Sequence, residues 1–346
     1  MQKWAQDIID SKDVRNLPVL YFPCLKNIGM GVPESVQSSQ KIAEAMAEVI
    51  KEYPETIAAI TGMDLTVDSE AFGAAVHFSD TQAPNIESHV IEDAEDIKNL
   101  KIPDMSAGRI QVFSDACAEA AKLITDRPIF GGMLGPFSLA ANLMEMSSAL
   151  MLAMEDEDSM KLLLEKATDF LIARAKDYKE KGANGVFIAE PTAGLLSPDM
   201  LDNLSSVYVK KIVDAVQDDY FFLILHDCGQ VVHSVDSMYK TGCKGHHYGN
   251  SVDMKDILPQ IPPDILVFGN IDPSCDFYTG TPESIFEKTT ALLESMKEYP
   301  HFVLSSGCDL APAVTNENVA AYYEACRQFN QKSGLKTVIN IDPFLA

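Results

Sequence analysis

The chain has 346 residues, of which 47% are apolar and 23% charged, and its 51 acidic side chains outnumber 27 basic ones. The formal net charge of −24 argues against binding to nucleic acid or to an anionic membrane surface, because both need clustered Lys and Arg. No run of about 18 apolar residues and no N-terminal signal pattern is present, so we expect a cytoplasmic protein that does not cross a membrane. Seven scattered cysteines are typical of free thiols in a reducing compartment.

Short apolar runs alternate with long amphipathic stretches along the chain. Most of the runs are uninterrupted, as in 221–225, and strands of this kind are buried on both faces, as in parallel sheets. Hydroxyl residues followed by proline, at Ser197-Pro198 and Thr281-Pro282, indicate where two of the intervening helices begin. Eight strands are predicted, at 18–23, 57–65, 128–134, 185–190, 221–226, 245–249, 265–270 and 301–305.

Eight strands that alternate with helices predict an α/β protein with a (β/α)8 TIM-barrel fold. We expect a single barrel domain over residues 1–346, with helical insertions after strand two, in 72–127, and after strand three, in 136–182. A doubly wound open sheet is the alternative, but its usual Gly-x-Gly-x-x-Gly turn is missing. The methionines at 144, 146, 151, 154 and 160 are predicted to fill a helical core, with a surface for a bulky planar cofactor as the alternative.

One histidine and two cysteines stand where predicted strands end. His226 and Cys228 are two residues apart at the end of the fifth strand, so their side chains point to the same side, with Cα atoms about 6.6 Å apart. Cys308 follows the eighth strand, and all barrel strands end at the same face. One imidazole and two thiolates suit Zn²⁺ and leave one open position, as in catalytic zinc sites. Each of these residues alone is more often a buried core side chain; their joint position favours a metal site.

Further polar side chains follow the fourth and seventh strands. Glu190 ends the fourth strand and is a candidate catalytic carboxylate, which could orient substrate or support the metal. A solvated loop acid is the alternative reading of Glu190. Asn270 and Asp272 end the seventh strand, Asn270 as a candidate binding residue and Asp272 as a second candidate catalytic carboxylate. Some residues of this kind only cap helices or bind loop amides.

The second and sixth strands carry the remaining candidates for substrate or cofactor binding. Asp64, Asp68 and Glu70 follow the second strand, and Asp64 and Glu70 are the binding candidates there. His246 and His247 are neighbours on the short sixth strand, so only one of them can face the barrel interior. That histidine is either a further group near the metal or a packing residue.

The motifs around these residues resemble those of the uroporphyrinogen decarboxylase superfamily, and within it the branch of methylcobamide:coenzyme M methyltransferases. The most specific part is the segment His226-Asp227-Cys228-Gly229 with the later Gly307-Cys308. The resemblance covers the chain from about residue 5 to about residue 330, with further matching segments at 63–73, 135–140, 190–193 and 269–273.

The resemblance implies a barrel in which His226, Cys228 and Cys308 hold zinc. It also implies a zinc-activated small substrate, most simply a thiol such as coenzyme M, and a methyl group carried by methylcobalamin on a separate corrinoid protein. Related enzymes remove the methyl group of a methoxylated substrate instead, and this reaction is one alternative. A catalytically silent module that binds corrinoid or metal is another.

Two departures from the superfamily bear on the chemistry. Decarboxylase members carry an arginine-rich stretch just after the first strand, whereas residues 23–29 contain no arginine here, and the whole chain has five. A porphyrinogen with eight carboxylates needs cationic partners, so uroporphyrinogen decarboxylation is the weaker alternative. Some relatives have a glutamate ligand near the end of the sixth strand, where this chain has Asn250. The fourth ligand is therefore open: water, substrate, His246 or His247.

Overall fold

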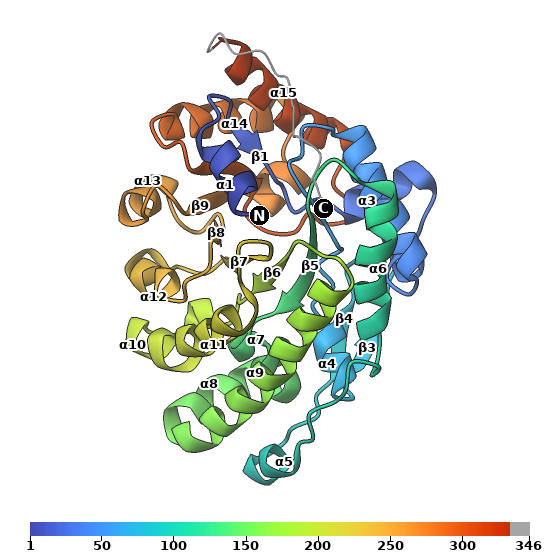
Figure 1. The fold of residues 1–346 in the computed structure, drawn as a ribbon, viewed down its shortest axis with the longest axis vertical. Coiled ribbons are helices and arrows are strands. Elements are labelled where there is room, and N and C mark those ends of the chain that lie inside the picture. The colour runs from blue at the N-terminus through green and yellow to red at the C-terminus, as the bar shows by residue number, and fades with distance from the viewer. Residues whose placement is uncertain (333–346) are drawn as a thin grey trace.

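A computed structural model describes residues 1–332, and Figure 1 shows a ring of parallel strands surrounded by helices. The eight-stranded sheet has the order β1-β10-β9-β8-β7-β6-β5-β2. Each strand of this sheet therefore lies beside the strand that follows it in the chain, except that β1 and β2 form the two edges. Its strands are β1 Arg15–Asn16, β2 Ala59–Ile60, β5 Ile129–Leu134, β6 Gly185–Ala189, β7 Phe222–Asp227, β8 Gly245–Tyr248, β9 Leu266–Ile271 and β10 Phe302–Ser306.

The two edge strands of this sheet meet and close it. Asn16 of β1 forms a parallel bridge with Thr56, just before β2, and the Ile57 amide donates to the Asn16 carbonyl at 3.1 Å. The predicted (β/α)8 barrel is therefore confirmed, and the open doubly wound sheet is wrong. Strands β5 to β10 are almost entirely buried, as their uninterrupted apolar runs predict.

The first two predicted strands differ from the structure. The predicted strand at 18–23 is wrong: β1 begins at Arg15, three residues earlier, and ends at Asn16, and Phe22–Ile28 forms a short 3-10 helix instead. Prolines at positions 18 and 23 have no amide proton to donate to a ladder, which explains why the strand stops before them. The predicted strand at 57–65 shortens to the two residues of β2, and the chain after it forms the loop that leads to helix α4, Val67–Ala71.

Helices cover the outer surface of the barrel, and both predicted helix starts are confirmed, with Ser197 and Thr281 as caps. The insertion after β2 is not purely helical, because it contains the antiparallel hairpin β3 Ala75–His77 and β4 Asn85–Ser88. The helices are α1 Gln2–Ile9, α2 Val32–Ser35, α3 Ser39–Glu52, α4 Val67–Ala71, α5 Ala94–Asn99, α6 Ile110–Leu123, α7 Pro136–Met144, α8 Met146–Glu155, α9 Glu157–Glu180, α10 Pro198–Leu201, α11 Val207–Val216, α12 Val235–Tyr239, α13 Met254–Ile257, α14 Pro282–Met296 and α15 Asn316–Lys332.

Two apolar cores stabilise the barrel, one between strands and helices and one inside the ring of strands. Helix α1 closes the inner core at the end where the strands begin, and its Gln2 amide donates to the Asp219 carbonyl just before β7. Trp4 of this helix packs against Phe130 and Phe222, with ring centroids 5.8 and 5.6 Å away. Because α1 seals that end, access to the interior is left to the other end, where the strands finish.

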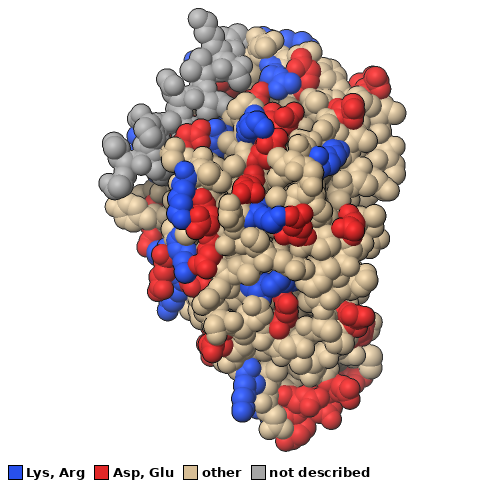
Figure 2. Space-filling view, turned by 90° about the vertical axis from the view of Figure 1, so that its right-hand side faces the viewer, with Lys and Arg blue, Asp and Glu red and all other residues tan. Residues whose placement is uncertain are grey.

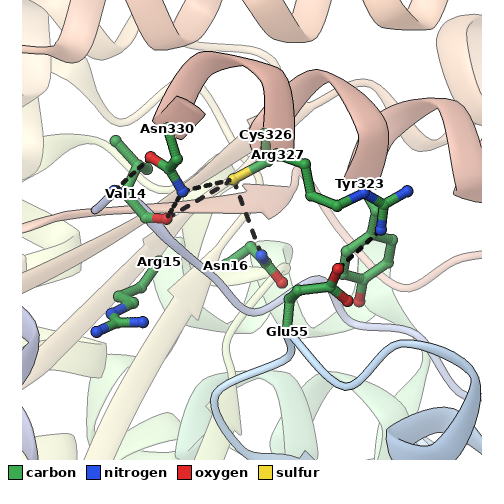
Figure 3. Close-up of a pocket in the computed structure, with 8 residues that line it drawn as sticks. All are labelled: Val14, Arg15, Asn16, Glu55, Tyr323, Cys326, Arg327 and Asn330. Carbon is green, nitrogen blue, oxygen red and sulfur yellow. Dashed lines mark hydrogen bonds and ion pairs between the residues drawn. The ribbon is translucent and has the colours of Figure 1, made fainter. Parts of the chain in front are cut away.

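The seam between β1 and β2 is held by helix α15 (Figure 3). The Asn330 side chain donates to the Val14 carbonyl at 3.1 Å and accepts from the Val14 amide at 3.0 Å. Arg327 of the same helix pairs with Glu55 at 2.8 Å. The cavity between these residues measures about 10 Å³, room for about one water molecule. It is part of the barrel closure and too small for a substrate.

Acidic and basic side chains alternate over the surface that Figure 2 shows, and no cluster of Lys and Arg stands out on this face. Acidic side chains gather at its lower end, where Figure 1 places α5. The exposed residues Glu92, Asp93, Glu95 and Asp96 lie in that region.

Helices α7, α8 and α9 carry the methionine-rich segment, with Met160 on α9. Met144 and Met160 are buried, but Met146, Met151 and Met154 are exposed, Met154 at 77%. The prediction of a wholly buried cluster is therefore wrong, because α8 packs on the protein along one side only. Within residues 1–332, no single helix is long and apolar enough to cross a membrane; α7 and α8 reach that length only together, and they meet at 111°.

We expect Trp4→Ala to lower the free energy of unfolding by about 3–5 kcal/mol, because it empties the space between Phe130 and Phe222. Urea denaturation followed by circular dichroism measures the change. Gln2→Ala on the exposed side of the same helix is the control, with an expected change within about 0.5 kcal/mol. Equal effects of the two substitutions would contradict a closing role of α1.

Candidate metal centre

The ends of β7 and β10 bring three side chains together across the barrel mouth. His226 is the fifth residue of β7, Cys228 follows that strand, and Cys308 lies two residues after β10. A ring nitrogen of His226 and the sulfur atoms of the two cysteines all lie within 4.8 Å of one another. The distance from Cys308 Sγ to His226 Nε2 is 3.6 Å. The imidazole is buried and both cysteines are partly exposed. The three donors can therefore share one ion that solvent or substrate can reach.

Glycines beside both cysteines let neighbouring loops approach closely. A Cβ atom on Gly229 would lie 2.6 Å from the Cα atom of Gly194, in the loop after β6. A Cβ atom on Gly307 would lie 2.7 Å from the Asn250 amide nitrogen, in the loop after β8. Side chains larger than hydrogen would push these loops apart, so the two glycines help to fix where Cys228 and Cys308 stand.

A chain of buried hydrogen bonds orients the His226 ring. Ser305 Oγ donates to the Leu17 carbonyl at 2.7 Å, so it accepts from His247 Nε2, 2.9 Å away. Burial lowers the pKa of His247 well below its usual range, so this ring is neutral and its Nδ1 atom is an acceptor. His226 Nδ1 lies 2.7 Å from that atom and must donate its proton there. The network therefore leaves the lone pair of His226 Nε2 free to face the thiols.

The two thiols affect each other. The pKa of Cys228 is lowered, chiefly by a hydrogen bond from the Cys308 thiol. The pKa of Cys308 is raised well above its usual range, first because its thiol donates a hydrogen bond to Cys228, then because it is buried, and also because its ionisation would place a second negative charge beside the Cys228 thiolate. One nitrogen and two sulfur donors, of which one readily ionises, match the ligand set that zinc prefers, and a bound cation would favour ionisation of the second thiol.

A pocket of about 200 Å³ lies directly beside His226 and Cys308. Its other walls are apolar side chains, among them Met63 and Leu65 from the loop after β2 and Phe187 from β6. The Asp309 carboxyl is its third polar group. The sequence analysis did not predict this pocket or name Asp309 as one of its residues. The position of Asp309, directly after the candidate ligand Cys308, could have indicated that it lies near the site.

The candidates from the fourth and seventh strands hold loops in place. Both oxygens of Glu190 accept hydrogen bonds at the start of α7, Oε1 from the Phe137 amide at 2.9 Å and Oε2 from the Ser138 amide at 2.8 Å. Asp272 Oδ1 accepts from two amides of the next turn, and its Oδ2 accepts from the Asn250 side chain at 2.8 Å. The Asn270 amide group donates to two carbonyls of the loop after β8. A direct catalytic role for Glu190 and Asp272 stays a prediction that these contacts do not support.

Asp64 and Glu70 share one partner that sequence reasoning did not find. The Arg109 guanidinium pairs with Asp64 through Nη1 and with Glu70 Oε2 through Nε, the latter at 2.7 Å. Arg109 also donates to the Thr66 hydroxyl at 2.9 Å. The cluster fixes the loop that carries Met63 and Leu65, and no sequence signal links residues 64 and 109. Asp68 lies apart from it, beside Arg174, and accepts from the Leu134 amide at 2.8 Å.

The two adjacent histidines face opposite sides of β8, as the strand period predicts. His247 points into the barrel and contacts His226, whereas His246 is buried on the other face. Both His247 ring nitrogens already have partners, so His247 orients a ligand and does not compete for the fourth position. Within the described residues, neither ring nitrogen of His246 has a hydrogen-bond partner.

These features define a TIM barrel with a nitrogen–sulfur donor set at the face where its strands end. Residues 15–329 match the model of the uroporphyrinogen decarboxylase (URO-D) family, so the chain belongs to this family. Methylcobamide:CoM methyltransferase MtbA of Methanosarcina acetivorans is 29% identical over 86% of this chain and 87% of its own length. Uroporphyrinogen decarboxylase of Pseudoalteromonas translucida is 24% identical over 86% and 85%. The solved structure of a methyltransferase from Methanosarcina mazei, 24% identical, covers 95% of this chain and 98% of its own, with a TM-score of 0.85.

We expect Arg109→Met to lower the free energy of unfolding by about 3–5 kcal/mol, because it leaves the buried Asp64 carboxylate without its cation. Thermal or urea unfolding measures the loss. Lys122→Met removes an exposed ion pair with Glu119 and is the control, with an expected change of about 0–1 kcal/mol. A similarly small effect of Arg109→Met would mean that the cluster does not hold the loop.

Proposed function

We propose that the chain is a zinc-dependent methyltransferase that moves a methyl group between a corrinoid and a small thiol. The observation that carries this proposal is the convergence of His226 Nε2 and the sulfurs of Cys228 and Cys308 beside a pocket. Three protein ligands leave a fourth position for a substrate atom, as in catalytic zinc sites. Similarity to a relative that is named for methylcobamide and coenzyme M supports the corrinoid as methyl carrier.

The residues of this chain have defined tasks in that reaction. Zinc, when bound, supplies a Lewis acid that lowers the pKa of a coordinated substrate thiol and keeps it as the nucleophilic thiolate. His247 and Ser305 orient the His226 ring, and the apolar pocket walls hold the substrate sulfur in place and exclude water. The sulfur forms a bond to the methyl carbon as the cobalt–carbon bond breaks. Cobalt keeps the electron pair of that bond, and the thiol proton goes to solvent.

The size of the pocket supports a separate corrinoid protein as partner. At about 200 Å³ the pocket is smaller than the roughly 300–1,000 Å³ of pockets for drug-sized ligands, and a corrinoid is larger than such ligands. The small substrate therefore enters the pocket, and the corrinoid approaches the barrel mouth from outside.

Decarboxylation of uroporphyrinogen, the reaction in the name of other relatives, has less support. Its substrate carries eight carboxylates, which need Arg or Lys partners. Among the described residues that line the pocket there is no Arg or Lys. The donor set of one imidazole and two thiols also has no use in binding carboxylates.

We expect the purified wild-type protein to hold close to one zinc ion per chain and to transfer methyl groups from methylcobalamin to a thiol. Cys308→Ser should lose most of the zinc and the transfer, because hydroxyl oxygen is a much weaker ligand than thiolate. Elemental analysis and the absorbance change of methylcobalamin measure the two losses. Cys275→Ser, at an exposed cysteine, is the control and should change neither. A Cys308→Ser protein with full zinc and full transfer would refute the proposal.

We expect His247→Asn to weaken zinc binding by about 10- to 100-fold, since His226 then loses the acceptor that fixes its ring. Competition with a chromophoric chelator measures the affinity without any activity assay. His246→Asn removes the neighbouring buried ring on the opposite strand face and should leave the affinity unchanged. Equal affinities for wild type and His247→Asn would show that the ring orientation does not depend on this contact.

A further inference from the structure

The pocket beside His226 and Cys308 is polar only at the metal centre and directly next to it. Its described lining has three polar residues: the two candidate ligands and Asp309, which follows Cys308 in the chain. All other residues of this lining are apolar, among them Met63 and Leu65. A substrate sulfur at the fourth zinc position therefore places the rest of the molecule against apolar side chains.

Buried residues of the barrel strands form one part of the apolar wall. Phe187 and Ala189 of β6 are each 1% exposed, and the Phe187 ring lies beside the His226 ring, with centroids 6.0 Å apart. A Cβ atom on Gly132 of β5 would lie 2.7 Å from Met63 Sδ, so the Met63 side chain packs directly on the backbone of that strand. These apolar surfaces are in place before a substrate enters.

Arg109 holds two further parts of the wall, which loops provide. It pairs with Asp64, in the loop after β2 that contributes two of the apolar residues. Its guanidinium also lies over Phe78, with the central carbon 4.9 Å from the ring centroid. Phe78 belongs to the turn between β3 and β4, and this turn carries the lining residues Ala83 and Pro84. One buried side chain thus fixes both loops around the pocket.

An anionic substrate tail finds no cation in the described lining of the pocket. Arg109 is committed to Asp64 and Glu70. Arg174 is buried on α9 next to Asp68. The other three arginines of the chain lie near the seam between β1 and β2, at positions 15, 127 and 327. A sulfonate or carboxylate would lose its hydration without gaining a cationic partner, so the pocket disfavours anions even without a negative charge of its own.

An uncharged polar tail finds few partners either. Apart from the two candidate ligands, Asp309 is the only polar side chain of the described lining, and its Oδ1 atom is buried with almost no accessible surface. A hydroxyl group against the apolar walls would give up hydrogen bonds to water without replacement, which costs binding free energy. An alkyl group in the same place gains free energy by leaving water.

We propose that the thiol substrate of this chain carries a short, uncharged alkyl side chain that binds between Met63, Leu65 and Phe187. The pocket volume of about 200 Å³ is below that of pockets for drug-sized ligands, so the side chain is short. This inference rests on the proposed thiol methyltransferase function and narrows its substrate class. It separates the chain from enzymes that act on coenzyme M, which is 2-mercaptoethanesulfonate and ends in an anion.

Thiols of matched length test the end group on the zinc-loaded protein. 1-Propanethiol and 2-mercaptoethanol are both uncharged at this end and differ only in a terminal methyl or hydroxyl group. We expect 1-propanethiol to bind about 10- to 100-fold more tightly than 2-mercaptoethanol, and at least about tenfold more tightly than 2-mercaptoethanesulfonate. Calorimetry measures binding, and loss of the methylcobalamin absorbance measures methyl transfer.

The outcomes separate this inference from the proposed function. Equal or tighter binding of either polar thiol would overturn the alkyl substrate class, and methyl transfer to that thiol would leave the proposed methyltransferase intact. Failure of all three thiols to bind or to accept a methyl group would refute both.

A series of alkanethiols tests the walls without any change of the end group. From ethanethiol to 1-propanethiol to 1-butanethiol, we expect each methylene group to tighten binding about fourfold until the pocket is full. These thiols have nearly equal acidities, so the zinc site does not distinguish them. No gain from ethanethiol to 1-propanethiol would contradict an apolar subsite for the tail.

Substitutions in the wall place the preference in this pocket. Ala83→Leu should weaken binding of 1-butanethiol severalfold and change that of ethanethiol little, because the larger side chain fills the space for a longer tail. Ala75→Leu, at an exposed position of the same hairpin, is the control and should change neither. Val19→Thr keeps the shape of a wall residue but adds a hydroxyl, so it should reduce the advantage of 1-propanethiol over 2-mercaptoethanol severalfold.

The zinc content of each variant is measured, so that metal loss is separated from a change in selectivity. The different acidities of 1-propanethiol and 2-mercaptoethanol act at zinc, and they cancel when one variant is compared with wild type. Unchanged affinity ratios in both Ala83→Leu and Val19→Thr would overturn the assignment of this pocket as the binding site of the tail.

Discussion

The hydrogen-bonded chain from His226 through His247 and Ser305 to the Leu17 carbonyl links the metal centre to four parts of the barrel wall: β7, β8, β10 and the segment after β1. It depends on strand register, since His226 and His247 are partners in the parallel pair of β7 and β8. A shift by one residue would turn His247 outward and bring His246 into the barrel. The closure and the register of the whole sheet therefore determine where the lone pair of His226 Nε2 points.

The two ends of the barrel have different tasks. Helix α1 and its Trp4 fill the end where the strands begin, so this end contributes stability. At the other end, the loops after β2, β6 and β10 and the end of β7 surround a small and mostly apolar pocket, in which His226 and Cys308 form the metal-binding side. Arg109, Glu190 and Asp272 belong to the second end but act on loops, and they hold the backbone that carries the pocket walls and the cysteines. These three charged side chains near the site thus hold loops in position, and their contacts do not indicate a part in the reaction.

The uroporphyrinogen decarboxylase family includes relatives that are named for two different reactions on one fold. A shared barrel does not decide between them, because function depends on the groups that the loops bring to the site. In this chain those groups are a nitrogen, two sulfurs and a carboxyl, with the arginines committed elsewhere. This inventory suits the activation of a thiol, and it does not suit a substrate that is bound through many negative charges.

The sequence by itself was sufficient for the features that depend on local patterns. Apolar runs predicted the six longer strands of the barrel, and the strand period placed His226 and Cys228 on one side and His246 and His247 on opposite sides. Only the tertiary structure decided which histidine faces inward, that Glu190 binds the start of α7, and that Arg109 pairs with Asp64, 45 residues earlier. Periodicity describes neighbours within one strand or helix. Contacts across a closed barrel depend on register and loop path, which no short segment of the chain determines.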